Sequence, residues 1–171
     1  HRYIRRQRQM CIRDSSRIDV LEHVFKKKIE NTLFAGIYNE EIFRELKNKK
    51  NKIVIKDSIS KKKISISIDK FYLKNDNAIV ISNNNTVIFT KYRKPFHYLS
   101  DFRELNINLK KYKILIVKSG YLSPELKKLK ADNFMILTDG FVTQDFKRIK
   151  NLFREKPIYP FQKNFRYNIA I

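Results

Sequence analysis

The chain has 171 residues, of which 42% are apolar, so it is long enough to bury a core as one domain. It has no run of about 18 apolar residues, so we expect no membrane span. Its first residues carry charge without the apolar centre of a secretory signal. Its single cysteine, Cys11, excludes an internal disulfide, and we therefore expect a cytoplasmic protein. The net charge of +21 suggests nucleic acid as a partner, but the lysines are spread through every segment, which favours a solvated surface over a specific nucleic-acid site.

Residues 1–14 differ from the rest of the chain, because they are rich in arginine whereas the remaining residues prefer lysine. The string RQMCIRDS is similar to a translated sequencing-adapter remnant of the kind seen at the ends of metagenomic gene models. We favour an artefact or a disordered leader over a basic arm that binds phosphate. In that case the gene continues upstream, residues 15–164 form the domain, and residues 165–171 are a tail.

The domain opens with a helix and then a strand-helix unit. Apolar residues recur at three- and four-residue steps over 15–28, which predicts an amphipathic helix with His23 at its surface or boundary. Residues 32–37 are a short apolar run that predicts a strand. Asn39, followed by two glutamates, is typical of the N-cap of a helix, which we expect to end near Lys47.

Residues 51–90 change to the alternation of strands, and we expect an inserted antiparallel meander. Three consecutive asparagines at 83–85 predict a hairpin turn, since asparagine tolerates left-handed backbone angles. The lysines at 61–63 fit a solvated strand edge better than a phosphate site. A loop over 90–97 then leads to a helix over 99–105. We expect His97 to fix that loop beside the helix, with a role in a cleft as the alternative.

The stretch 113–161 contains two more strand-helix units. Apolar runs at 113–117 and 134–137 are typical of strands buried on both faces of a parallel sheet. Ser123-Pro124-Glu125 and, after the second run, Thr143 with Asp145 predict helix starts. Right-handed crossovers would make the two strands parallel neighbours, with the turns 118–120 and 138–140 side by side at the carboxyl edge. The sequence therefore predicts an α/β fold: a mixed sheet with three strand-helix units and an inserted antiparallel β-meander.

The strings VKSGYLSPEL, LTDGFVTQDF and KPIYPF occur in that order and resemble the C-terminal domain of the MlrC (microcystin LR degradation protein C) family. The resemblance extends upstream through VIFTKYRKPFHYLSDFRELNINLKKYKILIVKSG and, more weakly, to VLEHVFKKKIENTLFAGIYNEE. These are zinc metallopeptidase-like proteins. The resemblance implies that this chain supports or completes the active-site cleft of an N-terminal catalytic domain, which would be its partner and would supply contact with a peptide-like substrate.

Zinc hydrolysis needs about three convergent ligands and an open coordination position. His1, His23 and His97 are far apart in the sequence, and no His-Glu-x-x-His, paired-cysteine or nucleophile-elbow motif is present. We therefore expect no catalytic residue, metal or cofactor in this chain. The resemblance implies that the zinc ligands belong to the N-terminal domain. The alternative function is a basic, non-enzymatic nucleic-acid-binding module.

The resemblance does identify a candidate cleft wall. Lys118 and Ser119 match the Lys-Ser of the family at a strand end, and Thr138 and Gly140 match its Thr-Pro-Gly turn, with aspartate in place of the proline. We expect Lys118 to be an exposed lysine that anchors an anionic group of the substrate or of the partner domain. The alternatives are a simple ion pair for Lys118 and a turn cap for Ser119. His97 completes this set of candidate cleft residues.

Overall fold

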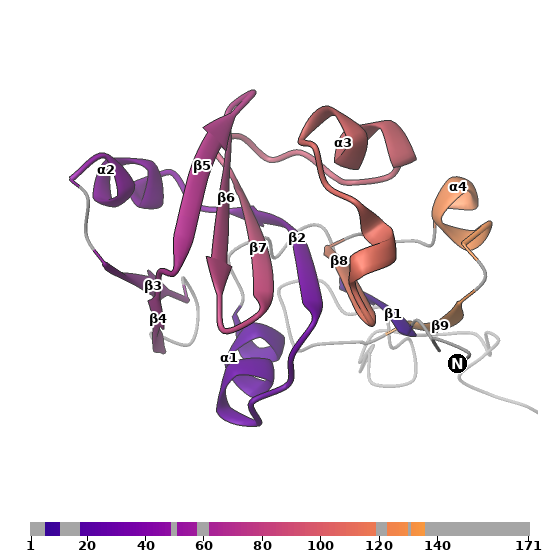
Figure 1. Cartoon of the computed structure of the whole chain (residues 1–171), viewed down its shortest axis with the longest axis horizontal. Helices are drawn as coiled ribbons and strands as arrows, with labels where there is room; N and C mark the ends of the chain where they lie inside the picture. Colours follow the sequence, from indigo (N-terminus) through magenta and orange to yellow (C-terminus); the bar gives the residue numbers. More distant parts are fainter. Residues whose placement is uncertain are drawn as a thin grey trace, which may run out of the picture.

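The computed structural model describes residues 6–10, 18–48, 51–57, 62–118, 123–129 and 131–135 (Figure 1). The expected turn at 138–140, the helix after Thr143 and the tail at 165–171 lie outside these residues. The elements are β1 (Arg6–Met10), α1 (Asp19–Lys26), β2 (Thr32–Tyr38), α2 (Glu41–Lys47), β3 (Lys52–Lys56), β4 (Lys63–Ser67), β5 (Lys70–Lys74), β6 (Asn77–Ser82), β7 (Asn85–Thr90), α3 (Leu99–Glu104), the 3-10 turn η2 (Leu109–Lys111), β8 (Ile114–Lys118), α4 (Pro124–Lys127) and β9 (Asp132–Met135).

The main sheet confirms the predicted mixed α/β fold. Its seven described strands lie in the order β5-β6-β7-β2-β8-β1-β9. Strands β7, β2, β8, β1 and β9 are parallel to one another, whereas β5, β6 and β7 form an antiparallel meander. Helices α1 and α2 pack against one buried cluster of the sheet and α3 and α4 against another, so the sheet has core on both faces.

The first strand corrects one expectation. Strands β8 and β9 are parallel, as predicted, but they are not neighbours: β1 lies between them, with Arg8 opposite Ile116 on one side and Phe134 on the other. Residues 6–10 of the predicted leader thus form a strand of the main sheet, and whether the leader is an artefact stays a prediction. Their sequence, RQRQM, has no apolar run that would predict a strand. The strand is held by backbone pairing with β8 on one side and β9 on the other. That the gene continues upstream of residue 14 stays a prediction.

The inserted strands also differ from a single meander. Strands β3 and β4 form a separate antiparallel pair, while β5, β6 and β7 form the meander that joins the main sheet through β2. The separate pair and the meander differ in how their strands are buried. Strands β3 and β4 bury alternate isoleucines and expose the residues between them, whereas all of β7 is buried. Near β4, Lys62 makes an ion pair with Asp19 of α1 at 3.1 Å, so it contacts a helix as well as solvent.

Turn and cap residues match their predicted roles. Asn83 and Asn84 have positive φ angles of 47° and 59° between β6 and β7, the backbone that a two-residue hairpin turn requires. Asn39 accepts a hydrogen bond from the Ile42 N–H at 3.2 Å at the start of α2. Ser123 is the N-cap of α4, with Pro124 at the first helical position. Strand β9 is less buried than predicted, because Phe134 is 48% exposed. None of the helices in the described ranges is long and apolar enough to cross a membrane.

Candidate functional site at the carboxyl edge of the sheet

The carboxyl ends of the parallel strands define one edge of the sheet. Strands β7, β2 and β8 end there at Thr90, Tyr38 and Lys118. The loop over 91–98 leaves this edge toward α3, and α4 follows β8 on the same side of the sheet as α3 (Figure 1). Ligands of open α/β sheets bind at such edges. This edge is therefore the candidate site, as the sequence predicted.

Lys118 is buried rather than exposed. Only 5% of its surface is accessible, so the expectation of an exposed lysine is wrong. The four preceding residues of β8 are apolar and pack in the core, and the burial continues through the last residue of the strand. A buried ammonium group is rare unless it has a charged or hydrogen-bonding partner. Lys118 is thus a lysine held at the buried end of a core strand.

Gly36 of β2 lies beside Lys118 and has a backbone that other residues rarely adopt. Its φ is +86°, and the pairing of β2 with β7 shifts register between Ala35 and Ile37, as in a β-bulge. A methyl group at this position would lie 3.4 Å from the carbonyl oxygen of Lys94, 3.4 Å from the Phe96 ring and 3.9 Å from the Lys118 Cβ. The loop therefore crosses directly over β2 next to Lys118.

Replacing Gly36 by alanine is expected to lower the free energy of unfolding by about 1–2 kcal/mol, because the positive φ is strained for a residue with a Cβ. Urea denaturation of the purified chain measures this loss. An unchanged denaturation midpoint in Gly36→Ala would contradict the assigned backbone.

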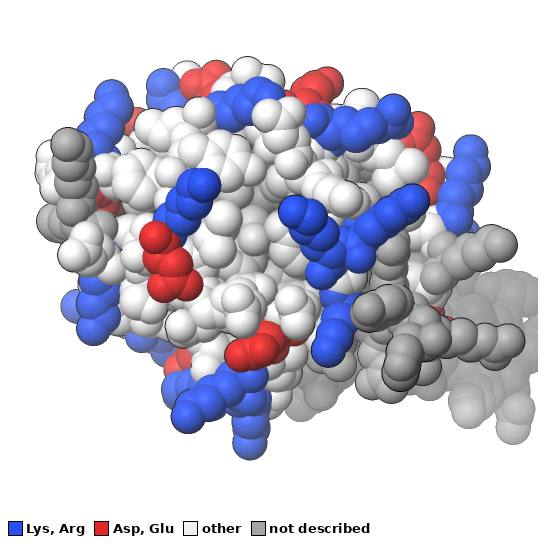
Figure 2. Space-filling view, in the orientation of Figure 1, with Lys and Arg blue, Asp and Glu red and all other residues white. Residues whose placement is uncertain are grey.

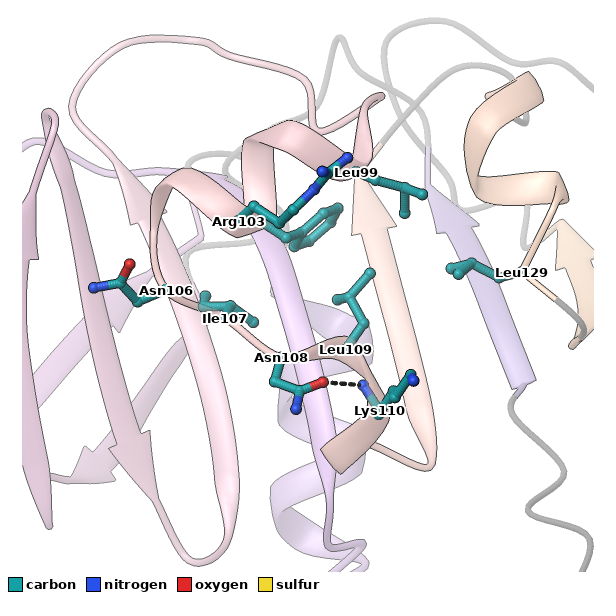
Figure 3. A pocket seen from close by; sticks show the side chains of 9 residues that line it. Leu99, Arg103, Asn106, Ile107, Asn108, Leu109, Lys110 and Leu129 are labelled. Atoms are coloured by element: carbon teal, nitrogen blue, oxygen red, sulfur yellow. Dashed lines mark hydrogen bonds between the residues drawn. The ribbon is translucent and has the colours of Figure 1, made fainter.

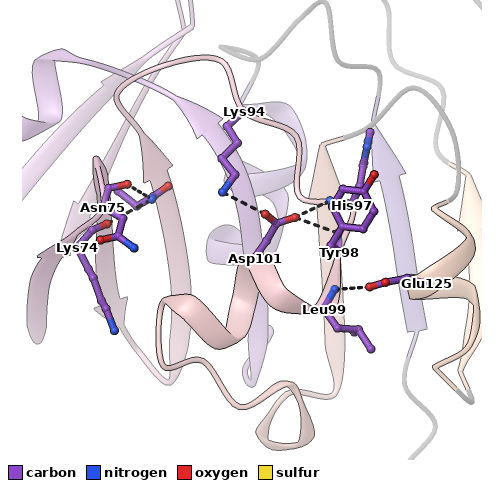
Figure 4. A network of polar contacts seen from close by, with 9 residues as sticks. Lys74, Asn75, Lys94, His97, Tyr98, Leu99, Asp101 and Glu125 are labelled. Carbon is purple, nitrogen blue, oxygen red and sulfur yellow. Dashed lines mark hydrogen bonds and ion pairs between the residues drawn. The ribbon is translucent and has the colours of Figure 1, made fainter.

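Asp101 holds the loop from the first turn of α3. Its Oδ2 accepts hydrogen bonds from the backbone N–H groups of His97 at 3.1 Å and Tyr98 at 2.9 Å (Figure 4). Its Oδ1 makes an ion pair with the Lys94 ammonium at 3.0 Å. Because the Asp101 side chain is mostly buried, these three contacts compensate for its desolvation. One carboxylate therefore fixes both ends of the segment 94–98.

Helix α4 holds the same loop from the other side. The Ser123 hydroxyl donates a hydrogen bond to the carbonyl oxygen of His97, and Glu125 Oε2 accepts one from the Leu99 N–H at 2.8 Å. Glu125 thus places a negative charge at the first residues of α3, where free N–H groups favour it. The segment after β7 and the helix after β8 are joined at the carboxyl edge. The sequence predicted Ser123 and Glu125 as part of the start of α4, but it did not predict the contact of Ser123 with the loop or of Glu125 with α3.

The structure places two of the candidate cleft residues at this edge. His97 is half-buried, and its backbone is held through both its N–H and its carbonyl. Its expected role in fixing the loop stays a prediction. Its ring lies edge-on to Tyr98, with 6.5 Å between centroids. Its role in a cleft stays a prediction, as does that of Lys118. Ser119, Thr138 and Gly140 lie outside the described residues.

The outer part of the loop is basic and aromatic. Tyr92 and Tyr98 are 61% and 58% exposed. The Lys91 ammonium lies 5.3 Å from the Tyr92 ring centroid, and its interaction with that phenol, followed by the charge of Asp76, raises the pKa of Lys91 above its ordinary value. Within the described ranges, no group of three or more histidine, cysteine, aspartate or glutamate side chains is arranged to hold a metal. The described part of the edge thus offers cations and hydrogen-bonding groups but no cluster of three metal-ligating side chains.

Charge is dispersed over the face of the molecule that Figure 2 shows. Figure 2 shows lysine and arginine side chains scattered over the visible face, with acidic side chains and neutral surface between them. Several acids pair with these cations, including Glu22 with Lys26 at 2.7 Å. This distribution agrees with the predicted solvated lysine surface.

Comparisons with known proteins support the resemblance seen in the sequence. The profile of the family described as MlrC C-terminus matches residues 57–151, which is more than half of the chain. A crystal structure from Mesorhizobium sp. BNC1, described as "Putative metallopeptidase", superposes with a TM-score of 0.65 at 10% sequence identity. At that identity the superposition shows a shared fold alone. The match covers 96% of this chain and 39% of the Mesorhizobium chain, and no curated protein sequence matches.

The profile spans the meander, the loop that crosses Gly36, the Asp101 cap, β8 with Lys118, and α4. The fold and the sequence therefore agree on one assignment: this chain belongs to the MlrC C-terminus family.

Proposed function

We propose that this domain completes the active-site cleft of a metallopeptidase-like protein whose catalytic zinc is held by an N-terminal domain of the same protein. The family assignment supports a peptidase-related role. The observation that carries the proposal is Lys118, a buried cation at the carboxyl edge, with the loop over 94–98 held beside it at several points. A fixed ammonium group at such an edge suits a carboxylate, either of a peptide substrate or of the partner domain.

Zinc does not fit the described part of this chain. Asp101 and Glu125 accept hydrogen bonds from backbone N–H groups at the start of α3 and just before it. Among the residues that the structure describes, no three metal-ligating side chains come together. The chemistry of peptide hydrolysis would therefore belong to the other domain, and this domain would bind and orient. The single cysteine is consistent with a cytoplasmic location, which we include in the proposal.

The test is peptide hydrolysis by the full-length protein compared with the same protein lacking this domain. We expect peptide hydrolysis to require this domain. We expect the protein that lacks it to bind as much zinc as the full-length protein. Zinc bound stoichiometrically by this chain alone, and lost in His97→Ala, would overturn this division of roles. Full activity without the domain would overturn the proposed cleft role.

The net charge of +21 suggests a second candidate function, a basic nucleic-acid-binding module. We expect only weak, sequence-independent binding whose affinity falls steeply with salt, because dispersed lysines release counterions without reading bases. A salt titration with duplex and single-stranded DNA, using a chain lacking residues 1–14, measures this. Submicromolar affinity that persists near physiological salt would instead favour the binding module.

A further inference from the structure

An open apolar groove lies beside the candidate site. It runs from α3 to η2, and the segment after α4 forms its opposite wall, as Figure 3 shows. Its volume is about 460 Å³, within the range of specific binding sites. The groove starts near Leu99, whose N–H bonds to Glu125, and therefore adjoins the carboxyl edge. It is lined by Leu99, Phe102, Arg103, Asn106, Ile107, Asn108, Leu109, Lys110 and Leu129.

The groove is built from the core outward. Phe102 and Ile107 are buried in the cluster that supports α3, and they provide a fixed apolar floor. Leu99, Leu109 and Leu129 pack against that cluster but stay partly exposed. Figure 3 shows Leu129 pointing from the opposite wall toward the groove. Three half-buried leucines around one groove form the kind of apolar patch that marks an interaction surface.

The polar rim of the groove has one sign of charge. Arg103 and Lys110 are exposed, and the other polar lining residues are the neutral Asn106 and Asn108. No acidic side chain is among the lining residues. An occupant with apolar side chains toward the leucines and carboxylates toward the two cations would therefore match both the surface and its charge.

We propose that this groove binds an amphipathic segment, with an apolar face flanked by acidic residues, from the part of the longer protein that lies outside this domain. The inference rests on the proposed function, since it assumes a second domain in the same polypeptide. The Mesorhizobium chain supports such an arrangement, because only 39% of it is matched by this domain. The groove would dock the second domain, and its position next to the carboxyl edge would align that domain with Lys118.

The test uses the complete 171-residue chain and two synthetic amphipathic helical peptides with the same leucine face. One peptide carries glutamate at its polar positions and the other carries lysine. Backbone NMR titration should show shifts at residues 102–110 and 129 with the glutamate peptide only. Leu109→Asp should weaken this binding at least about tenfold. The matched control is Leu73→Asp, which changes the charge equally at an exposed leucine on β5 and should leave the affinity unchanged.

Further variants separate charge and folding effects. Arg103→Gln with Lys110→Gln should weaken binding about tenfold at low salt, whereas Lys70→Gln with Lys74→Gln should not. If Leu109→Asp does not fold, the double variant of Arg103 and Lys110 still tests the proposal. Equal binding of both peptides, no binding, or binding unaffected by the groove variants would overturn the proposal. So would concentration-dependent shifts of the groove residues without peptide, because they would identify a second copy of this chain as the occupant. Lys118→Met should leave binding of the glutamate peptide to the groove intact. Peptide hydrolysis by this variant tests the cleft role, whereas peptide binding tests the groove, so failure of one proposal is distinguishable from failure of the other.

Discussion

Replacing Asp101 by alanine is expected to lower the free energy of unfolding by about 2–4 kcal/mol, because two backbone N–H groups lose their acceptor. The Asp101 carboxylate accepts from His97 and Tyr98 and pairs with Lys94. The Lys94 side chain is 45% exposed, so the ion pair itself contributes less than about 1 kcal/mol. Most of the loss should therefore come from the two capping hydrogen bonds. Urea denaturation of the complete chain measures it.

Asp101→Asn is the matched control for this prediction. Its amide oxygen can still accept from the two N–H groups, whereas the ion pair with Lys94 is lost, so we expect a loss of only about 1 kcal/mol. Amide hydrogen exchange at His97 and Tyr98 should speed up more in the alanine variant than in the asparagine variant. Equal losses in the two variants would show that charge rather than backbone capping holds the loop.

The elements that the sequence predicted correctly depend on local chemistry. Asn39 and Ser123 cap their helices because their side chains accept from N–H groups three residues later in the chain. Asn83 and Asn84 turn the chain because asparagine tolerates positive φ. Residues within a few positions of each other carry enough information for these features.

The errors arose where distant residues decide the structure. Strand β1 is placed by pairing with β8 and β9, more than 100 residues later in the chain, and its own sequence carries no strand pattern. The burial of Lys118 reflects its position in the central part of the sheet, where β2 lies on one side and β1 on the other. Neither fact could be read from the residues next to Lys118.

Two residues of the site could have been found in the sequence. Asp101 stands three residues after Tyr98, and an acid at that position is a known partner for the free N–H groups at a helix start. Gly36 stands inside an apolar strand pattern, where glycine often marks a bulge or a close backbone approach. The contacts of Glu125 with Leu99 had no such signal, because they join elements 26 residues apart.

Replacing Lys118 by methionine in the full-length protein is expected to lower kcat/KM for peptide hydrolysis by about 30- to 150-fold, or roughly 2–3 kcal/mol. Methionine keeps an unbranched apolar side chain in the buried site but removes the positive charge. If that charge holds a carboxylate of the substrate or of the catalytic domain, the partner is left unpaired in the closed cleft. The loss should then appear in activity while the Tm changes little.

The matched control is Lys111→Met, since Lys111 is an exposed lysine in η2, and its replacement should change activity by less than about 0.5 kcal/mol. Steady-state kinetics and thermal unfolding of both variants separate the alternatives. Unchanged kinetics with an unchanged Tm in Lys118→Met would eliminate the cleft role. A collapse in stability would assign Lys118 to a structural ion pair, because removing one member of a buried pair leaves an uncompensated charge in the core. Reduced kcat/KM with an intact fold would support a direct role for this edge in binding.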